Sequence, residues 1–379
     1  MIPHSNDSGN VLSAFLRDCC WYFHRFYRKS SKFPSYNMAE AQNSKFQVYL
    51  QDFGNILGAS PKLTLALSDD SPLFHEACVF VPRLNAVFVT SNQFVPPGQD
   101  NKTIVISKLS RGSNGLWRRE ELDAPTIPFA NGGINYDNGI LFCAQGSLTH
   151  NGGLLWMSAE PPYSTKVVVD NYRGYPFNSP NDVVVHSDGS IWFTDPAYGV
   201  EQGIRPEPKL ANQVYVYTPA DGDIRVMADG FGKPNGICFS PDEQTVYITD
   251  SDFVRGDGNM DARRARTIYA FDLIRRHDAP FLTNRRVFAY SDTGIPDGIK
   301  CDTDGNVYSG CGDGLNVWNP GGSLLGKVRV PGGVANFCFG RSGELFLLNE
   351  TKFWVLEFDR DVRGALLKGM GIDADGASA

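Results

Sequence analysis

The chain has 379 residues, of which 12% are aromatic and 20% charged, and its formal net charge at pH 7 is −7. Gly and Pro are plentiful as well, a mix typical of turn-rich β proteins rather than helical bundles. The acidic balance argues against nucleic-acid binding, which needs a clustered basic face. No run of about 18 apolar residues occurs, so we expect no membrane span.

Residues 1–45 read as an extension that precedes the folded domain. Within them, the stretch VLSAFLRDCCWYFHRFYR (residues 11–28) is aromatic and basic at roughly helical spacing. Arg17 and Asp18 interrupt the apolar core that a signal peptide needs. A membrane-surface helix is one alternative. We favour an N-terminal extension that is partly helical or disordered.

Six later segments share one plan: a polar anchor residue, an alternating apolar run, a tight turn and a second apolar run. The turns Asn138-Gly139, Asp188-Gly189, Asp304-Gly305 and Ser342-Gly343 have hairpin chemistry, because Gly readily adopts positive φ. In chain order the segments are HEACVFVPRLNAVFVTSN (75–92), NGGINYDNGILFCAQG (131–146), PNDVVVHSDGSIWFTD (180–195), PNGICFSPDEQTVYITDS (234–251), PDGIKCDTDGNVYSGC (296–311) and ANFCFGRSGELFLLNE (335–350).

The spacing of the anchors predicts the fold. Units of about 40–50 residues with several strands each are typical of propeller blades. Further strand-like runs between the hairpins, such as NQVYVYTP, RTIYAFDL and FWVLEFD, give each unit material for four strands. We therefore predict an all-β fold, a six-bladed β-propeller over residues 46–364, with a C-terminal tail at 365–379. The anchors, with successive gaps of 55, 50, 54, 62 and 39 residues, are Glu76, Asn131, Asn181, Asn235, Asp297 and Asn336.

The anchors predict a cation site. The innermost strands of a propeller line its central channel, so residues at one place in every unit form a ring at one mouth. Two carboxylates and four carboxamides make an oxygen-rich environment suited to a divalent cation, with Ca²⁺ preferred and Mg²⁺, Mn²⁺ or Zn²⁺ as alternatives. A single Asn or Asp before a strand more often forms a turn. Glu76 is a poor turn former in the same position, which favours the cation.

The cysteines indicate the compartment. The eight Cys residues show no CxxC spacing, so a structural zinc site is not expected. Four of them lie in alternating apolar runs, where free Cys acts as a small buried hydrophobe. We interpret these four as reduced core thiols, which predicts a reducing, cytoplasmic location; one disulfide in a secreted enzyme is the alternative. The four are Cys78, Cys238, Cys301 and Cys338.

At the anchors the sequence resembles the SMP-30/gluconolactonase/LRE-like family of six-bladed propeller lactonases, especially its fungal lactonohydrolases. The resemblance covers about residues 50–360. The motifs that carry it are FHEACVF, SPNDVVVHSDGSIWFTDPAYG, KPNGICFSPDEQTVYITDS and IPDGIKCDTDGNVYSG. It implies hydrolysis of a small-molecule lactone with one divalent cation at the mouth of the channel.

The resemblance also implies roles for single residues. Glu76, Asn235 and Asp297 match the family's metal ligands. Asn181 matches the asparagine that contacts substrate or metal-bound water, and we count it with both the metal-binding and the catalytic residues. Asp297 matches the aspartate usually given the role of base.

Other positions are candidate substrate contacts. Animal gluconolactonases have an arginine two residues before the substrate asparagine; this chain has Ser179, so gluconolactone specificity does not follow. The TDPAYG stretch resembles a fungal loop that faces the pocket. The tentative substrate-binding set is Ser179, His75, His150, Asp195, Tyr198 and Asp250.

Lactone hydrolysis needs a polarised carbonyl, a deprotonated water and a stabilised oxyanion. One divalent cation supplies the first and third and lowers the pKa of a bound water. Because a cation also lowers the pKa of a ligating carboxyl, we expect Asp297 to be ligand first and base second. A His75–His150 pair acting as base is an alternative, set against ordinary hydrogen-bonded structural histidines. No Gly-x-Ser-x-Gly elbow occurs.

Two other functions remain open. One is a propeller enzyme that acts on another ester or a biosynthetic intermediate, and the other is a non-catalytic ligand-binding propeller. Retention of Glu76, Asn181, Asn235 and Asp297 together favours an enzyme, because a scaffold has no need of all four. The pattern predicts neither the lactone nor the oligomeric state.

Overall fold

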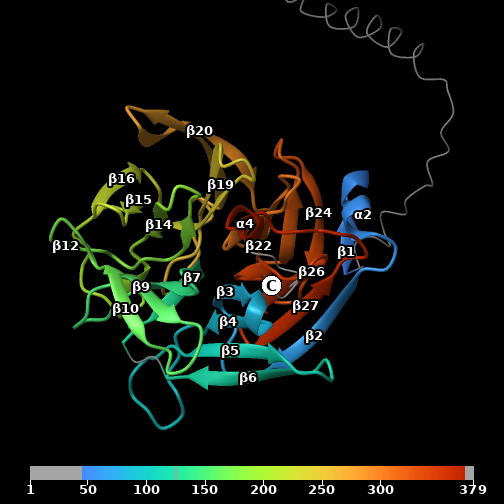
Figure 1. Cartoon of the computed structure of the whole chain (residues 1–379), viewed down its shortest axis with the longest axis horizontal. Coiled ribbons are helices and arrows are strands. Elements are labelled where there is room, and N and C mark those ends of the chain that lie inside the picture. The colour runs from blue at the N-terminus through green and yellow to red at the C-terminus, as the bar shows by residue number, and fades with distance from the viewer. Residues whose placement is uncertain (1–44, 124–125, 372–379) are drawn as a thin grey trace, which may run out of the picture. The chain divides into compact units, whose positions relative to one another are not determined.

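The computed structural model describes residues 45–123 and 126–371. The predicted N-terminal extension, except Lys45, lies outside the described residues, as does the predicted tail beyond residue 371. In the described residues, six antiparallel sheets surround a central channel as the blades of a β-propeller (Figure 1). The predicted fold class is confirmed.

The strands run from the channel outward in each blade. Blade one holds β3 (Glu76–Val81), β4 (Ala86–Thr90), β5 (Ile106–Arg111) and β6 (Trp117–Leu122), and blade two holds β7 (Ala130–Tyr136), β8 (Gly139–Ala144), β9 (Gly153–Ser158) and β10 (Thr165–Val169). Blade three holds β13 (Val183–Val185), β14 (Ile191–Asp195), β15 (Gln213–Thr218) and β16 (Asp223–Ala228). Blade four holds β17 (Pro234–Phe239), β18 (Thr245–Asp250), β19 (Thr267–Arg276) and β20 (Ala279–Tyr290).

Blades five and six involve strands from the beginning of the described chain. Blade five holds β21 (Ile299–Cys301), β22 (Val307–Cys311), β23 (Gly314–Trp318) and β24 (Leu324–Arg329), with β1 (Phe46–Val48) added outside β24. Blade six holds β25 (Phe337–Phe339), β26 (Glu344–Asn349), β27 (Lys352–Glu357) and β2 (Lys62–Ser68). The remaining elements are the hairpin β11 (Asn171–Tyr172) and β12 (Tyr175–Pro176), and the helices α2 (Gln51–Leu57), η1 (Pro82–Leu84), α3 (Tyr198–Glu201) and α4 (Ala365–Gly369).

Each predicted repeat forms the two innermost strands of one blade. The predicted turns bring the chain back at once, and Asn138 and Gly189 have φ of 60° and 85° there. Alternate apolar side chains from neighbouring blades pack against one another and form the core. The four cysteines predicted in the core are buried.

The ring closes by pairing the two ends of the described chain. Strand β2 pairs antiparallel with β27, with Lys62 opposite Glu357, and so completes blade six from the N-terminal side. The last three strands of that blade come from residues 337–357.

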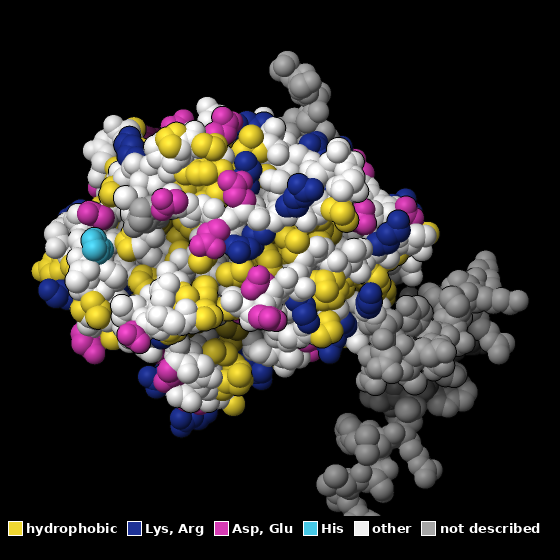
Figure 2. Space-filling view, turned by 90° about the horizontal axis from the view of Figure 1, so that it is seen from below, with side chains coloured by type: hydrophobic (Ala, Val, Ile, Leu, Met, Phe, Trp, Pro, Cys, Tyr) yellow, Lys and Arg dark blue, Asp and Glu magenta, His cyan; other side chains and the backbone are white. Residues whose placement is uncertain are grey.

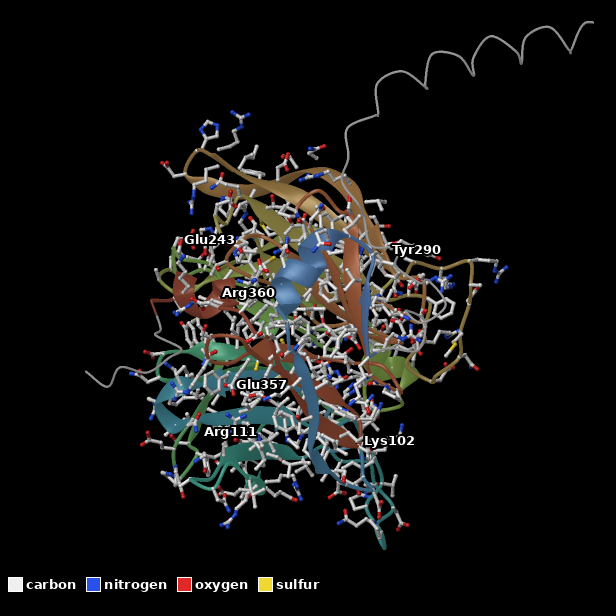
Figure 3. All side chains as sticks on the ribbon, turned by 90° about the vertical axis from the view of Figure 1, so that its right-hand side faces the viewer. Lys102, Arg111, Glu243, Tyr290, Glu357 and Arg360 are labelled. Carbon is white, nitrogen blue, oxygen red and sulfur yellow. The ribbon has the colours of Figure 1, made fainter. Side chains whose placement is uncertain are left out.

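All anchors lie at one end of the channel, which we call the anchor face. Each inner strand begins there and the next strand returns to it, as the pairing of Glu76 with Thr90 shows. Lys102 and Tyr290 lie toward the anchor face in Figure 3, and Glu243 and Arg360 toward the opposite, rear face. Four long connections belong to the anchor face: residues 91–105, 145–152, 196–212 and 251–266.

The helix α4 occupies the rear end of the channel. Figure 1 shows it near the middle of the ring. Its residues Ala365, Leu366 and Leu367 each pack against a different apolar cluster of the propeller. A β-bridge between Asp302 and Gly364 fixes the segment that leads into it. Part of the predicted tail therefore forms a plug in the channel.

The surface carries mixed charge. On the face shown in Figure 2, Lys and Arg side chains are interspersed with Asp and Glu. Across residues 45–123 and 126–371, no helix combines the length and apolar character that a membrane span requires.

Candidate active site

Glycines let the anchors of adjacent blades approach each other. Gly132 N donates a 2.8 Å hydrogen bond to the carbonyl oxygen of Asn181, the anchor of the next blade. A Cβ atom at Gly236 would lie 2.4 Å from the carbonyl oxygen of Asp297, which is too close for any other residue. The glycine after an anchor therefore allows the tight ring.

Three threonines hold the backbone of the next anchor. Thr90 Oγ1 donates to Asn131 O at 2.9 Å, and Thr194 Oγ1 donates to Asn235 O at 2.6 Å. Thr249 Oγ1 donates to Asp297 O at 3.0 Å. All three threonines are fully buried on the second strand of their blades. This role was not predicted from the sequence, although a Thr before Asp or Ser recurs at the end of the second strand.

Glu76 is buried and oriented by the last blade. It opens β3, where Ala77 and Cys78 have φ of 63° and 57° and the pairing with β4 shifts register. Asn336 Nδ2 donates a 2.6 Å hydrogen bond to Glu76 Oε2, while Asn336 Oδ1 accepts from Phe337 N. Asn336 therefore positions Glu76, and its own oxygen is already used.

Three other anchors present free oxygens. Asn131 Oδ1, Asn181 Oδ1 and Asp297 Oδ1 are buried and have no hydrogen-bond partner among the described residues. A buried oxygen without a partner costs free energy unless something else satisfies it. Asn235 donates a side-chain hydrogen bond to Asp297.

The electrostatics of the ring fit a cation. Burial and the charge of Asp297 raise the pKa of Glu76 above its ordinary range. Burial also raises the pKa of Asp297, against the attraction of His75. The carboxyl groups of Glu76 and Asp297, beside the unpartnered amide oxygens of Asn131 and Asn181, form an all-oxygen donor set, which is the kind that hard divalent cations prefer.

His75 forms an ion pair with Glu350 beside the ring. Its Nδ1 lies 2.8 Å from Glu350 Oε1. Burial opposes the charged imidazole, but Glu350 and the nearby anchors Glu76 and Asp297 raise the pKa of His75 to about 10. The imidazole is therefore protonated near neutral pH and is a poor base in this arrangement. Glu350 was not predicted as a site residue from the sequence, although it ends the sixth repeat.

Asp195 and Ser179 support the loop before the anchor Asn181. The Asp195 carboxylate is fully buried and accepts hydrogen bonds from Asn178 N at 2.9 Å and Ser179 N at 2.8 Å. Ser179 Oγ donates to Pro196 O at 2.6 Å and accepts from Gly199 N at 2.9 Å. The structure thus places both residues behind the anchor, with their polar groups engaged by backbone.

Asp250 has the same position in blade four. Its carboxylate accepts from Gly232 N and Lys233 N at 2.9 and 2.8 Å. Tyr198 is buried in α3, with its hydroxyl 3.3 Å from Ser251 O and Lys233 Nζ 5.5 Å from its ring centre. Burial raises the pKa of Tyr198 well above its usual value, and Asp297 adds to this effect. Among Ser179, Asp195, Tyr198 and Asp250, the charge of the anchor Asp297 affects the pKa of Tyr198.

His150 is exposed on the loop 145–152, and its side-chain contacts in the described residues are to Ser147 and Thr149 rather than to the His75–Glu350 pair. Its Nδ1 contacts Thr149 Oγ1 at 2.9 Å. The backbone of this loop, rather than the imidazole, is held by Arg205. Arg205 Nη1 donates to the carbonyl oxygens of Ser147 and His150, both at 2.7 Å. The buried Arg205 therefore fixes this loop, a role that no sequence pattern indicated.

The connection 196–212 bonds to the other three long loops of the anchor face. Arg205 joins it to 145–152, as above. Lys102 Nζ donates to Gln202 O at 2.7 Å, and Gly256 N donates to Glu201 Oε2 at 2.6 Å. The four loops thus form one connected wall around the anchors.

A family model described as the SMP-30/gluconolactonase/LRE-like region matches residues 110–348. The chain belongs to this family. The matched span includes the anchors from Asn131 to Asn336 but not Glu76. The case for Glu76 therefore rests on the geometry described above.

Curated relatives in this family match most of the chain. The lactonohydrolase oryL of Aspergillus oryzae is 30% identical over 326 residues, which cover 79% of this chain and 71% of the relative. A gluconolactonase of Zymomonas mobilis is 27% identical and covers 82% of this chain and 88% of its own length. A solved structure described as a gluconolactonase from Xanthomonas campestris is 26% identical, with a TM-score of 0.66 and coverage of 83% and 94%.

Proposed function

We propose that this chain is a lactonase that opens a lactone ring by hydrolysis at the anchor face, with one divalent cation held by Glu76, Asn181, Asn235 and Asp297. Two relatives are named for lactone hydrolysis, which supports the reaction class. The observation that carries the proposal is the set of buried, unpartnered oxygens on Asn131, Asn181 and Asp297, beside the buried carboxyl group of Glu76. Asn131 offers a further oxygen to the same ring.

The donor set also guides the choice of cation. All candidate ligands are carboxylate or amide oxygens, and no thiolate or imidazole ligand is among them. Such a set favours Ca²⁺, Mg²⁺ or Mn²⁺ over Zn²⁺, and Ca²⁺ tolerates a flexible mixture of carboxylates and amides best.

The anchor residues have separate chemical roles. When bound, the cation polarises the lactone carbonyl and stabilises the negative charge that develops on its oxygen. Asp297 Oδ1 accepts the proton of the attacking water, and the Asn181 carboxamide positions the lactone ring. The bond between the carbonyl carbon and the ring oxygen then breaks, and the ring oxygen leaves as a hydroxyl after it takes up the proton.

Neighbouring side chains hold the two carboxyl-bearing anchors in place. Thr249 and Asn235 hold Asp297 by its carbonyl and carboxyl groups, and Asn336 holds Glu76. The loops of the anchor face are bonded to one another, and exclusion of bulk water by them would strengthen the electrostatic interactions inside.

A substrate panel tests the proposal. Aldonolactones, pantolactone and aromatic lactones are assayed with purified protein, with and without EDTA, and metal content is measured in parallel. We expect turnover of at least one lactone that EDTA abolishes and a divalent cation restores. Asp297→Asn should lose at least a hundredfold in turnover, with the surface variant Asp272→Asn unchanged.

The other outcomes discriminate between the alternatives. Turnover that survives complete removal of metal would refute the cation-dependent mechanism. Turnover of a different ester only would point to the related esterase function, and saturable binding without turnover would favour a ligand-binding propeller.

A further inference from the structure

A cavity lies in the channel on the side of the plug α4. It has a volume of about 780 Å³ and is lined by the inner strands of the blades together with α4. Its apolar lining includes Val79, Ile134, Val184, Ile237, Phe339 and Leu366. We call it the rear cavity. Such a volume is in the range of small-molecule sites.

A lysine side chain is part of the lining. Lys300, on β21 of blade five, lines the rear cavity, and its side chain is 13% exposed. Its Nζ lies 3.7 Å from Asp182 Oδ2, which belongs to blade three. Lys300 therefore reaches across the channel, between the anchors and the cavity.

The ammonium group of Lys300 forms an ion pair with Asp182 but donates no hydrogen bond to the residues that the structure describes. The distance of 3.7 Å to Asp182 is too long for one, and Lys300 Nζ has no hydrogen-bond acceptor among the described residues. Asp182 is already engaged, because its carboxylate accepts from Val183 N at 2.9 Å and Ile237 N at 3.2 Å. An ammonium has three donors, so Lys300 can donate to a ligand in the cavity while it stays paired with Asp182.

The rim of the cavity limits what can enter. Asp137, Asp242 and Glu243 line its outer part, and Glu243 accepts a hydrogen bond from Ser187 N. Carboxylates there repel small multivalent anions such as phosphate. An anion with a single charge and a long apolar part gains burial along the walls that offsets this repulsion.

We propose that the rear cavity is a second ligand site, which binds a monocarboxylate with an apolar chain. The carboxylate accepts hydrogen bonds from Lys300 Nζ, and the chain lies along the inner strands toward Leu366 of the plug. A charge-assisted hydrogen bond of this kind is among the stronger polar contacts. The site is separate from the anchors, and the inference does not depend on the proposed hydrolysis.

Built-in reporters make the site testable. Cys78, Cys238, Cys301 and Cys338 all line the rear cavity. Cys143 and Cys311 are equally buried but are not among its lining residues. Octanoate is the probe, octanamide its uncharged match, and inorganic phosphate the small-anion control. All binding is measured by calorimetry on the full chain in saturating Ca²⁺.

We expect octanoate to bind saturably and at least tenfold more tightly than octanamide, with no binding of phosphate. Octanoate should slow N-ethylmaleimide labelling of the four cavity thiols at least tenfold and leave labelling of Cys143 and Cys311 unchanged. Lys300→Met should weaken octanoate at least tenfold without changing octanamide, and Lys300→Arg should retain binding. If Lys300→Met does not fold, the labelling pattern and the octanamide comparison on the wild-type chain still decide.

Several results would overturn the inference. They are the absence of saturable binding, equal affinity for octanoate and octanamide, protection of all six thiols alike, and an unchanged affinity in folded Lys300→Met. Loss of octanoate binding in Asp297→Asn or in EDTA would place the ligand at the anchors instead. Failure of the lactone panel has no bearing on any of these readouts.

Discussion

Asn336 Nδ2 donates a 2.6 Å hydrogen bond to Glu76 Oε2, and the two residues are 260 positions apart in the chain. The bond joins the inner strand of the last blade to that of the first. Closure of the ring and the orientation of a candidate cation ligand therefore depend on the same contact.

Asn336→Ala should weaken divalent-cation binding at least tenfold. The change removes the donor that fixes the Glu76 carboxylate, and leaving a buried acceptor unmet costs about 1–3 kcal/mol. Calorimetric titration with Ca²⁺ measures the affinity. Asn306→Ala is the matched control, because it removes a similar 2.8 Å bond to the carboxylate of Asp302, away from the anchors. Equal losses of affinity in both variants would contradict the role of Asn336.

Glu76→Gln and Asp297→Asn should have opposite effects on stability with and without the cation. In EDTA at pH 8 each variant should melt at a higher temperature than wild type. Each one removes a carboxyl group whose ionised form is disfavoured in the folded state, as its raised pKa shows. In excess Ca²⁺ wild type should gain stability by mass action, about 2.7 kcal/mol at a concentration 100 times Kd. The variants should gain little. Thermal melts with and without EDTA compare them, and an equal gain in all three proteins would rule out these ligands.

Thr249→Val should lower turnover several-fold more than Thr90→Val does. Both changes delete a buried hydroxyl that holds the backbone of the next anchor, so each should cost about 1–3 kcal/mol of unfolding free energy. Thr249 supports Asp297, the candidate base, whereas Thr90 supports Asn131. Steady-state kinetics and denaturant unfolding separate the two effects. Equal turnover in the two variants would show that the backbone of Asp297 needs no such support.

The ion pair of His75 and Glu350 should make stability fall as pH rises. The ordinary pKa of His is about 6.5, and in the folded chain Glu350 and the anchors overcome the opposing effect of burial and raise the pKa of His75 to about 10. Between these values the folded state holds the extra proton, so the contribution is complete below pH 6.5 and is lost toward pH 10. Glu350→Gln should flatten this dependence.

Urea unfolding of the EDTA-treated protein between pH 6 and pH 10 measures the slope. Glu357→Gln, which removes a carboxylate from the outer part of blade six, is the control and should keep the wild-type slope. A slope in Glu350→Gln equal to that of wild type would contradict the assignment.

His150→Ala should lose less than tenfold in turnover, because the imidazole is exposed and the loop is held by its backbone. Arg205→Met should lose more, since it removes the donors to Ser147 O and His150 O and frees the loop 145–152 from its neighbour. Hydrogen exchange of residues 145–152 should rise in Arg205→Met only. A larger loss in His150→Ala than in Arg205→Met would restore His150 as a candidate base.

The sequence was sufficient for the blade plan because each hairpin is local. The alternation of apolar residues and the Gly turns are read within about twenty residues, and the anchor at the head of each unit follows from them. The strand β2 was not foreseen, because its partner β27 lies at the other end of the chain.

The supports of the site could be foreseen only in part. The family resemblance marked Asp195 and Asp250 as candidate substrate contacts, but a matching residue type does not say whether a carboxylate faces a ligand or backbone N–H groups. Arg205 and Lys300 act through partners in other blades. Such pairings depend on three-dimensional closure and leave no local pattern.

The pairing of β2 with β27 also bears on how the chain is made. The residues of β2 are synthesised before those of any complete blade, and the residues of β27 only after those of five blades. A nascent chain that stops before β27 exposes an unpaired strand edge, which invites aggregation, and its sixth blade is incomplete. Synthesis through β27 is therefore a precondition for closing the ring of blades.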